Sequence, residues 1–158
     1  VKDTVNLMNE GASLNDVIHQ VKVDQKLIDL PWLTPVYDEP EFVVHNIWRM
    51  YGGWWDTDPS SLKPSPAKDL ADEVASLVGG ENILADRART LAEEGDFRLA
   101  SHLIEFAARA APQNLNIHGI RAEIYRARRR EESSLMSKGV FAAAMRESEA
   151  IVEQVEHE

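Results

Sequence analysis

The chain has 158 residues, of which 44% are hydrophobic and 28% charged, which is ordinary for a globular protein of one domain or slightly more. Its net charge of −10 disfavours binding to nucleic acid or to anionic lipid, because phosphate groups would repel it. Cysteine is absent, which excludes disulfides and thiolate metal sites. No stretch reaches the roughly 20 apolar residues that span a bilayer, and no signal peptide is present. We therefore expect a soluble protein, cytoplasmic rather than exported, and because the chain starts at Val1 rather than Met we expect it to be part of a longer protein.

The first part of the chain combines a short helix with a proline-rich segment. Ser13 precedes apolar residues at helical spacing, and Asp16 follows in the first turn, which predicts an N-capped helix. Residues 29–40 contain three prolines, and proline fixes φ and disfavours helix in the residue before it. This segment is therefore expected to form an extended strap over a surface.

The stretch from Phe42 to Lys63 combines aromatic residues with helix-ending signals. A helix is predicted from Glu41 to Tyr51, ended by two glycines, and its shared face is expected to carry Phe42, Val43, Asn46, Ile47, Met50 and Tyr51. The aromatic residues Trp48, Tyr51, Trp54 and Trp55 lie close together in the sequence. The stretch is interpreted either as a rigid junction between domains or as one wall of a substrate pocket.

From Ala67 onward the periodicity is helical throughout. Apolar stripes end at successive glycine and proline signals, and the last stripe runs from Leu135 to Val155. The hairpin predicted over residues 85–112, with small residues and a Gly-Asp turn, resembles a tetratricopeptide unit. The predicted fold is thus an all-α helical bundle with tetratricopeptide-like hairpins, preceded by a Pro-rich extended strap. We place the strap and junction helix in residues 1–66 and the helical domain in residues 67–158.

Few residues suggest chemistry by themselves. His102 and Glu105 lie three apart on one helix and could share a metal, but no further ligand pattern accompanies them. Arg126, Arg128, Arg129 and Arg130 form one basic cluster, which is interpreted as a solvated helix end offset by neighbouring glutamates or as a contact for an acidic partner. His45 is interpreted as a structural residue or, with Asn46 and Tyr51, as a donor to an anionic group in a cleft.

The order of these segments resembles one family. NLMNEG, PWLTPVYDEPEFVVHNIWRMYGGWWDTDPSSLKPSP, LADEVASLVGG and GDFRLASHLIEFAARAAP are similar to the alkyl sulfatases of the metallo-β-lactamase superfamily, which hydrolyse dodecyl sulfate-type detergents. The resemblance covers about residues 7–145, and the WRMYGGWWD element is its most specific part. It implies that this region is the all-helical dimerisation domain that follows a zinc-binding hydrolase domain.

The resemblance also implies cofactors, partners and site residues. Two zinc ions would be held by the hydrolase domain, and this chain, which has no HxHxDH-like run, should contain no metal site and be inactive alone. The expected partners are a second copy of the chain, forming a homodimer, and the hydrolase domain. His45, Asn46 and Tyr51 become substrate-pocket candidates near the sulfate, and Trp48, Trp54 and Trp55 become aromatics of the junction.

Two other functions remain open from the residues alone. A free-standing helical-hairpin adaptor could bind a peptide near the basic cluster at residues 126–130. A helical ligand-binding domain could use an aromatic cleft between Trp48 and Trp55.

Overall fold

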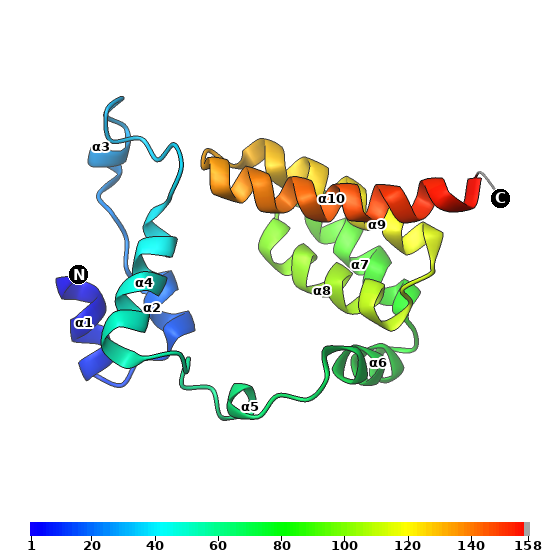
Figure 1. The fold of residues 1–158 in the computed structure, drawn as a ribbon, viewed down its shortest axis with the longest axis horizontal. Helices are drawn as coiled ribbons and strands as arrows, with labels where there is room; N and C mark the ends of the chain where they lie inside the picture. The colour runs from blue at the N-terminus through cyan, green and yellow to red at the C-terminus, as the bar shows by residue number, and fades with distance from the viewer. Residues whose placement is uncertain (157–158) are drawn as a thin grey trace. The chain divides into compact units, whose positions relative to one another are not determined.

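The computed structural model describes residues 1–156, and this part of the chain is all-helical, as predicted. Figure 1 shows its helices in chain order. Their bounds are α1 Lys2–Asn9, α2 Leu14–Gln20, α3 Gln25–Ile28, α4 Pro40–Gly52, α5 Pro59–Leu62, α6 Ala67–Val78, α7 Glu81–Glu93, α8 Phe97–Ala110, α9 Leu115–Glu131 and α10 Leu135–Glu156.

The chain divides into two compact units. Residues 1–64 together with residues 133–136 form unit 1. Residues 65–132 together with the described residues from 137 onward form unit 2. The sequence did not predict that the short connection between α9 and α10 would belong with the N-terminal segment.

Unit 1 has a small apolar core where α4 packs against α1 and α2. Ser13 caps α2 as predicted: its hydroxyl accepts from the amide of Asp16, and the Asp16 carboxylate accepts from the Ser13 amide in return. A Cβ at Gly52 would lie 2.8 Å from Cε of Met8, so the flexible end of this α1 side chain would have to shift. The fully or largely buried residues at the centre of this core are Val17, Val44 and Trp48.

The buried face of α4 is only partly the one predicted. Of the predicted face, Ile47 is buried but Val43, Met50 and Tyr51 are exposed. Val44 and Trp48, which were not predicted to share that face, are buried with Ile47. Both sets have spacings of three and four residues, so periodicity alone could not choose between them. The observed choice buries the large Trp48 side chain and gives its indole N–H an acceptor, as a buried tryptophan requires.

The Pro-rich segment contains turns, and the extended strap predicted for it is not confirmed. The Leu30 carbonyl accepts from the amides of Leu33 and Thr34, at 2.9 and 3.1 Å. The Thr34 hydroxyl donates back to the Ile28 carbonyl at 3.1 Å. Proline is as compatible with tight turns as with extended backbone, which is why its presence did not distinguish them.

The end of the Pro-rich segment caps the N-terminus of α10. The Val36 carbonyl accepts from the amide of Leu135 at 2.7 Å, and the Tyr37 carbonyl accepts from the amide of Met136 at 3.2 Å. The Ser134 hydroxyl, which is fully buried, also donates to the Tyr37 carbonyl, at 2.8 Å. Because the first amides of a helix have no acceptors within the helix, these carbonyls supply the missing partners.

Unit 2 is organised around α8, which packs against α6, α7 and α9. Small buried residues of α8, among them Ala100 and Ala107, let the neighbouring helices approach, and Ile104 fills the space between them. The hairpin predicted over residues 85–112 is present as α7 and α8, joined at Gly95, whose φ of +86° favours glycine. Its likeness to a tetratricopeptide unit stays a prediction. The last apolar stripe is helical, but the side chain of Val155 lies outside the described residues.

Candidate functional site

The aromatic residues of the junction mostly hold the backbone in place. The Trp48 indole N–H donates to the Trp55 carbonyl at 2.9 Å, and the Trp55 indole N–H donates to the Asp58 carbonyl at 2.9 Å. Trp48 is buried and Trp55 half-buried, whereas Trp54 is 74% exposed. Trp48 therefore fastens the loop after α4 onto the helix and Trp55 braces the loop internally, which leaves little support for an aromatic cleft between Trp48 and Trp55.

The turn after α4 is built around Asp56. Its carboxylate accepts from the amide of Asp58 at 2.9 Å and from the hydroxyl of Ser61. The Ser61 hydrogen bond, followed by the Asp58 amide, lowers the pKa of the Asp56 carboxyl group. The Asp56 carbonyl also accepts from the amide of Leu14 at 3.2 Å, which joins the turn to the start of α2. Thr57 has a φ of +74°, a strained conformation for a β-branched residue.

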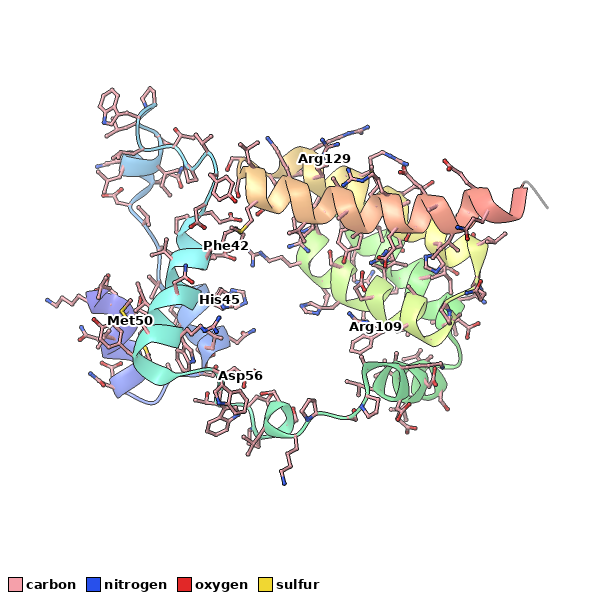
Figure 2. All side chains as sticks on the ribbon, in the orientation of Figure 1. Phe42, His45, Met50, Asp56, Arg109 and Arg129 are labelled. Carbon is pink, nitrogen blue, oxygen red and sulfur yellow. The ribbon has the colours of Figure 1, made fainter. Side chains whose placement is uncertain are left out.

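His45 lies on the wall of a pocket between α2 and this turn. The pocket has a volume of about 570 Å³, and Figure 2 labels His45 and Asp56, which both line it. Its wall also includes Ser13, Asn15 and Asp58. The imidazole could donate a hydrogen bond to an anion here, but the two aspartates oppose negative charge, so the pocket of this chain alone is not an anion site.

The three predicted pocket residues do not come together on this wall. Asn46 and Tyr51 are exposed on α4 but do not line the pocket that contains His45. Residues 45, 46 and 51 point in directions at least 100° apart around an ideal helix of about 3.6 residues per turn. The assignment of all three to one substrate pocket stays a prediction.

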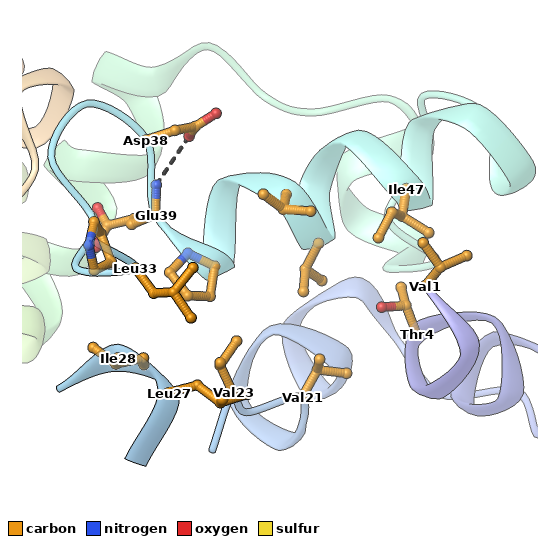
Figure 3. Close-up of a pocket in the computed structure, with 14 residues that line it drawn as sticks. Val1, Thr4, Val21, Val23, Leu27, Ile28, Leu33, Asp38, Glu39 and Ile47 are labelled. Carbon is orange, nitrogen blue, oxygen red and sulfur yellow. Dashed lines mark hydrogen bonds between the residues drawn. The ribbon is translucent and has the colours of Figure 1, made fainter. Parts of the chain in front are cut away.

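A second pocket in unit 1 was not predicted. It is apolar, has a volume of about 420 Å³ and lies among α1, the connection between α2 and α3, α3, the Pro-rich segment and α4 (Figure 3). Leu33 and Ile47 contribute to its wall, and the carboxylate of Asp38 accepts from the Glu39 amide at 3.0 Å. The fully buried Thr4 hydroxyl, also on the wall, has no hydrogen-bond partner. Its lining comes from five separate segments, so no single sequence motif could have indicated it.

Unit 2 contains a buried polar network between α8, α9 and α10. Arg121 donates from Nε to Oε1 of Glu105 at 2.8 Å, and from Nη1 to the Ala144 carbonyl at 2.9 Å and the Ser148 hydroxyl at 2.9 Å. Tyr125 donates to the same Glu105 oxygen at 2.9 Å. Burial alone would lower the pKa of Arg121, but the hydrogen bond and charge of Glu105 outweigh it and raise the pKa. The network holds the three helices together and keeps Arg121 charged.

His118 extends this network as a structural residue. Its Nδ1 lies 3.1 Å from the Ser148 hydroxyl, and its Nε2 lies 3.0 Å from the Pro112 carbonyl. A carbonyl only accepts, so Nε2 carries the proton, and a neutral ring then accepts the Ser148 proton at Nδ1. Ser148 thus donates to His118 and accepts from Arg121. Every polar atom of the imidazole has a partner inside unit 2.

The weaker sequence candidates have structural explanations. Glu105, the proposed metal partner of His102, is bound by Arg121 and Tyr125, and Arg109 lies 3.3 Å from its other oxygen. Among the side chains that the structure describes, which end at residue 154, no three His, Cys, Asp or Glu come together to hold a metal ion. The zinc ions implied by the family resemblance therefore do not fit this part of the chain.

The basic cluster is only partly solvated. Arg126 pairs with Glu149 at 2.5 Å. Arg128 donates to the Ser101 hydroxyl at 2.6 Å, and its guanidinium lies 4.3 Å from the centre of the Phe141 ring. Both therefore fasten helices within unit 2. Arg128 also lies 3.9 Å from Glu132, so a neighbouring glutamate offsets the cluster as predicted, although the helix end is only partly solvated. Only Arg129 and Arg130 are exposed, which weakens the peptide-binding adaptor hypothesis.

None of the helices in residues 1–156 is long and apolar enough to cross a membrane.

Comparison with solved structures supports the fold. The stereoselective inverting sec-alkylsulfatase Pisa1 from Pseudomonas sp. aligns with a TM-score of 0.82 and 21% identity, over 92% of this chain and 23% of that chain.

Curated relatives are sulfatases as well. A linear primary-alkylsulfatase from Pseudomonas sp. is 28% identical over 124 residues, which cover 78% of this chain and 24% of the relative. The alkyl/aryl-sulfatase BDS1 from Saccharomyces cerevisiae is 26% identical over 112 residues, which cover 70% of this chain and 17% of the relative. The chain thus spans at most about a quarter of the length of these relatives.

The family comparison covers most of the chain. Residues 13–150 match the model of a family described as alkyl sulfatase dimerisation, and this range includes most of both units. A family described by dimerisation implies that its members associate with copies of themselves. The chain belongs to the alkyl sulfatase dimerisation family.

Proposed function

We propose that this chain is the homodimerisation module of an alkyl sulfatase, a longer enzyme that hydrolyses an alkyl sulfate to an alcohol and inorganic sulfate. The match of residues 13–150 to the dimerisation family carries this proposal. Relatives named as alkylsulfatases support the reaction class. A homodimer is the simplest assembly that fits the family description, since most soluble homo-oligomers are twofold dimers.

The catalytic groups belong to another part of the enzyme in this proposal. The described residues offer no cluster for a metal ion, so the two zinc ions implied by the resemblance would be held by a hydrolase domain outside residues 1–156. What this chain contributes is a folded platform. Of the α4 candidates His45, Asn46 and Tyr51, His45 is the one offered to the substrate at the wall of a pocket. These side chains are exposed, and His45 already lines a pocket.

Two measurements test the module and the enzyme separately. Sedimentation equilibrium of the 158-residue chain should give twice the mass of 17.8 kDa at micromolar concentration. Sulfate release from decyl sulfate should be catalysed by the complete enzyme and not by this chain, with or without added zinc. A concentration-independent monomer would contradict the dimer, and turnover by the chain alone would show that it contains a catalytic site.

Substitution of His45 tests its role in the complete enzyme. We expect His45→Ala to raise KM for decyl sulfate about tenfold, the cost of about one hydrogen bond to a charged group, with a smaller change in kcat. His19→Ala is the control, because His19 is also an exposed histidine of unit 1 but does not line the pocket. Equal kinetics for both variants would remove His45 from the substrate site.

A further inference from the structure

An uncharged apolar surface lies where the Pro-rich segment meets the start of α10. It is defined by six large side chains, called the apolar patch below: Trp32, Leu33, Val36, Tyr37, Leu135 and Met136. The carbonyls of Val36 and Tyr37 accept from the amides of Leu135 and Met136, so the two segments are in direct contact within unit 1. The fold therefore brings Val36 and Tyr37 beside Leu135 and Met136, which lie about 100 positions away in the sequence, and Trp32 and Leu33 belong to the preceding turn of the Pro-rich segment.

The size of the apolar patch is unusual for a surface in contact with water. The exposed fractions run from 38% for Met136 to 76% for Trp32. With ordinary residue areas, these fractions sum to roughly 700 Å² of exposed surface over the six residues, against about 300–600 Å² for the largest apolar patch of a typical monomer. A standard interface buries about 800 Å² on each partner, so this patch is large enough to form the centre of one.

The charge distribution points to the identity of the partner. Residues 30–37 and 133–136 contain no charged side chain, in a chain whose net charge is −10. A twofold interface places a surface against its own copy, so an acidic surface would repel itself whereas an uncharged one would not. The patch is thus suited to bind a second copy of the same negatively charged chain.

The backbone beneath the apolar patch is held in place before any partner binds. Three hydrogen bonds join residues 36 and 37 to residues 134–136, and the turn at Leu30 fixes the segment that carries Trp32 and Leu33. Binding therefore costs little backbone entropy. Trp32 and Tyr37 are also of the residue types that contribute most at interfaces.

We propose that the apolar patch is the surface through which two copies of this chain form the homodimer. The inference rests on the proposed homodimer and specifies where it forms. All six residues lie within residues 13–150, the range that matches the dimerisation family. The patch would lie at or near the twofold axis, with Trp32 and Tyr37 of each copy packed on the other.

Two matched pairs of variants test this surface in the 158-residue chain. Val36→Glu is compared with Val140→Glu, because Val36 is 64% and Val140 61% exposed, and only Val36 belongs to the patch. Trp32→Ala is compared with Trp54→Ala, since these tryptophans are 76% and 74% exposed. The dimer dissociation constant is measured by sedimentation velocity over a dilution series, and far-UV circular dichroism confirms that each variant is folded.

We expect Val36→Glu to raise the dissociation constant at least about 100-fold, because a carboxylate from each copy would be buried without a partner. Trp32→Ala should raise it at least about tenfold through lost packing. Both controls should stay within about threefold of the unchanged chain. The Trp32 pair keeps the test valid if the glutamate variant fails to fold.

The outcomes separate the surface from the dimer itself. A monomeric unchanged chain would refute the homodimer and the inference with it. A dimer that tolerates both Val36→Glu and Trp32→Ala would leave the homodimer standing but refute this surface, and the patch would then be covered by another part of a longer chain. Equal weakening by a variant and its control would also refute the assignment.

Discussion

Arg121 offers a sharp test of how unit 2 is held together. Its side chain is 9% exposed, and it donates to groups on α8 and on α10. Arg121→Met keeps most of the side-chain length and its apolar contacts but removes the charge and every donor. The variant therefore isolates the electrostatic role of this residue.

The cost of Arg121→Met follows from the groups that it leaves behind. The Ser148 hydroxyl and the Ala144 carbonyl each lose a buried donor. Glu105 loses its partner at 2.8 Å but keeps the Tyr125 hydroxyl, and Arg109 remains 3.3 Å away. Glu147 is 67% exposed, so its ion pair with Arg121 contributes little. Removing one partner of a buried ion pair lowers stability by about 3–5 kcal/mol. Because Glu105 keeps other partners, we expect Arg121→Met to destabilise unit 2 by about 3 kcal/mol, the lower end of this range.

Two probes can separate the units during unfolding. All four tryptophans lie between residues 32 and 55, so their fluorescence reports on unit 1 only. Hydrogen exchange of peptides from α9 and α10, followed by mass spectrometry, reports on unit 2. We expect Arg121→Met to lower the protection of α9 and α10 by about 3 kcal/mol and to leave the tryptophan transition in place.

Arg129→Met is the matched control, because Arg129 is an exposed arginine on the same helix. Its effect should be within about 0.5 kcal/mol. If Arg121→Met costs less than about 1 kcal/mol, or if its effect equals that of the control, then the network does not hold α10 in place.

Two further predictions concern Tyr125 and Thr57. Burial, reinforced by the charge of Glu105, raises the pKa of Tyr125 to about 12. The folded state therefore favours the neutral phenol. This contribution to stability is fully present below about pH 10, the ordinary pKa of tyrosine, and is lost as the pH rises through about 12. Absorbance at alkaline pH should show an ionisation near pH 12 that Tyr125→Phe removes, and persistence of that step would refute the assignment. Thr57→Gly should stabilise unit 1 by about 1 kcal/mol in urea unfolding followed by tryptophan fluorescence, because glycine adopts a φ of +74° without strain. A loss of stability would mean that Thr57 contacts outweigh its backbone strain.

The helices could be predicted because their signals are local. Ser13 and Asp16 cap α2 within four residues of each other, and Gly95 with Asp96 separates α7 from α8. Such signals place the ends of helices but not the direction in which a helix faces. For α4, two apolar stripes had acceptable spacing, and the choice fell to Trp48 and its hydrogen bond to the Trp55 carbonyl.

The assignment of His45, Asn46 and Tyr51 to a substrate site stays a prediction, and the pocket beside His45 shows why the sequence could not assemble such a site. His45 is exposed on the wall of this pocket. Its neighbours Ser13 and Asp56 come from separate segments, joined by the hydrogen bond from the Leu14 amide to the Asp56 carbonyl. A backbone hydrogen bond can be made by almost any residue, so it leaves no trace in the sequence.

The apolar patch shows why contacts made by the backbone, which the sequence does not reveal, matter for function. Read alone, Trp32 and Val36 indicate only a Pro-rich segment, and Leu135 indicates only the start of a helix. The carbonyls of Val36 and Tyr37 accept hydrogen bonds from the first two amides of α10. These two hydrogen bonds bring two uncharged segments side by side. Because a helix of 22 residues requires acceptors at its N-terminus, the same contact that stabilises α10 also builds the surface assigned to the dimer. Weakening the cap should therefore weaken association even where no side chain of the patch has changed.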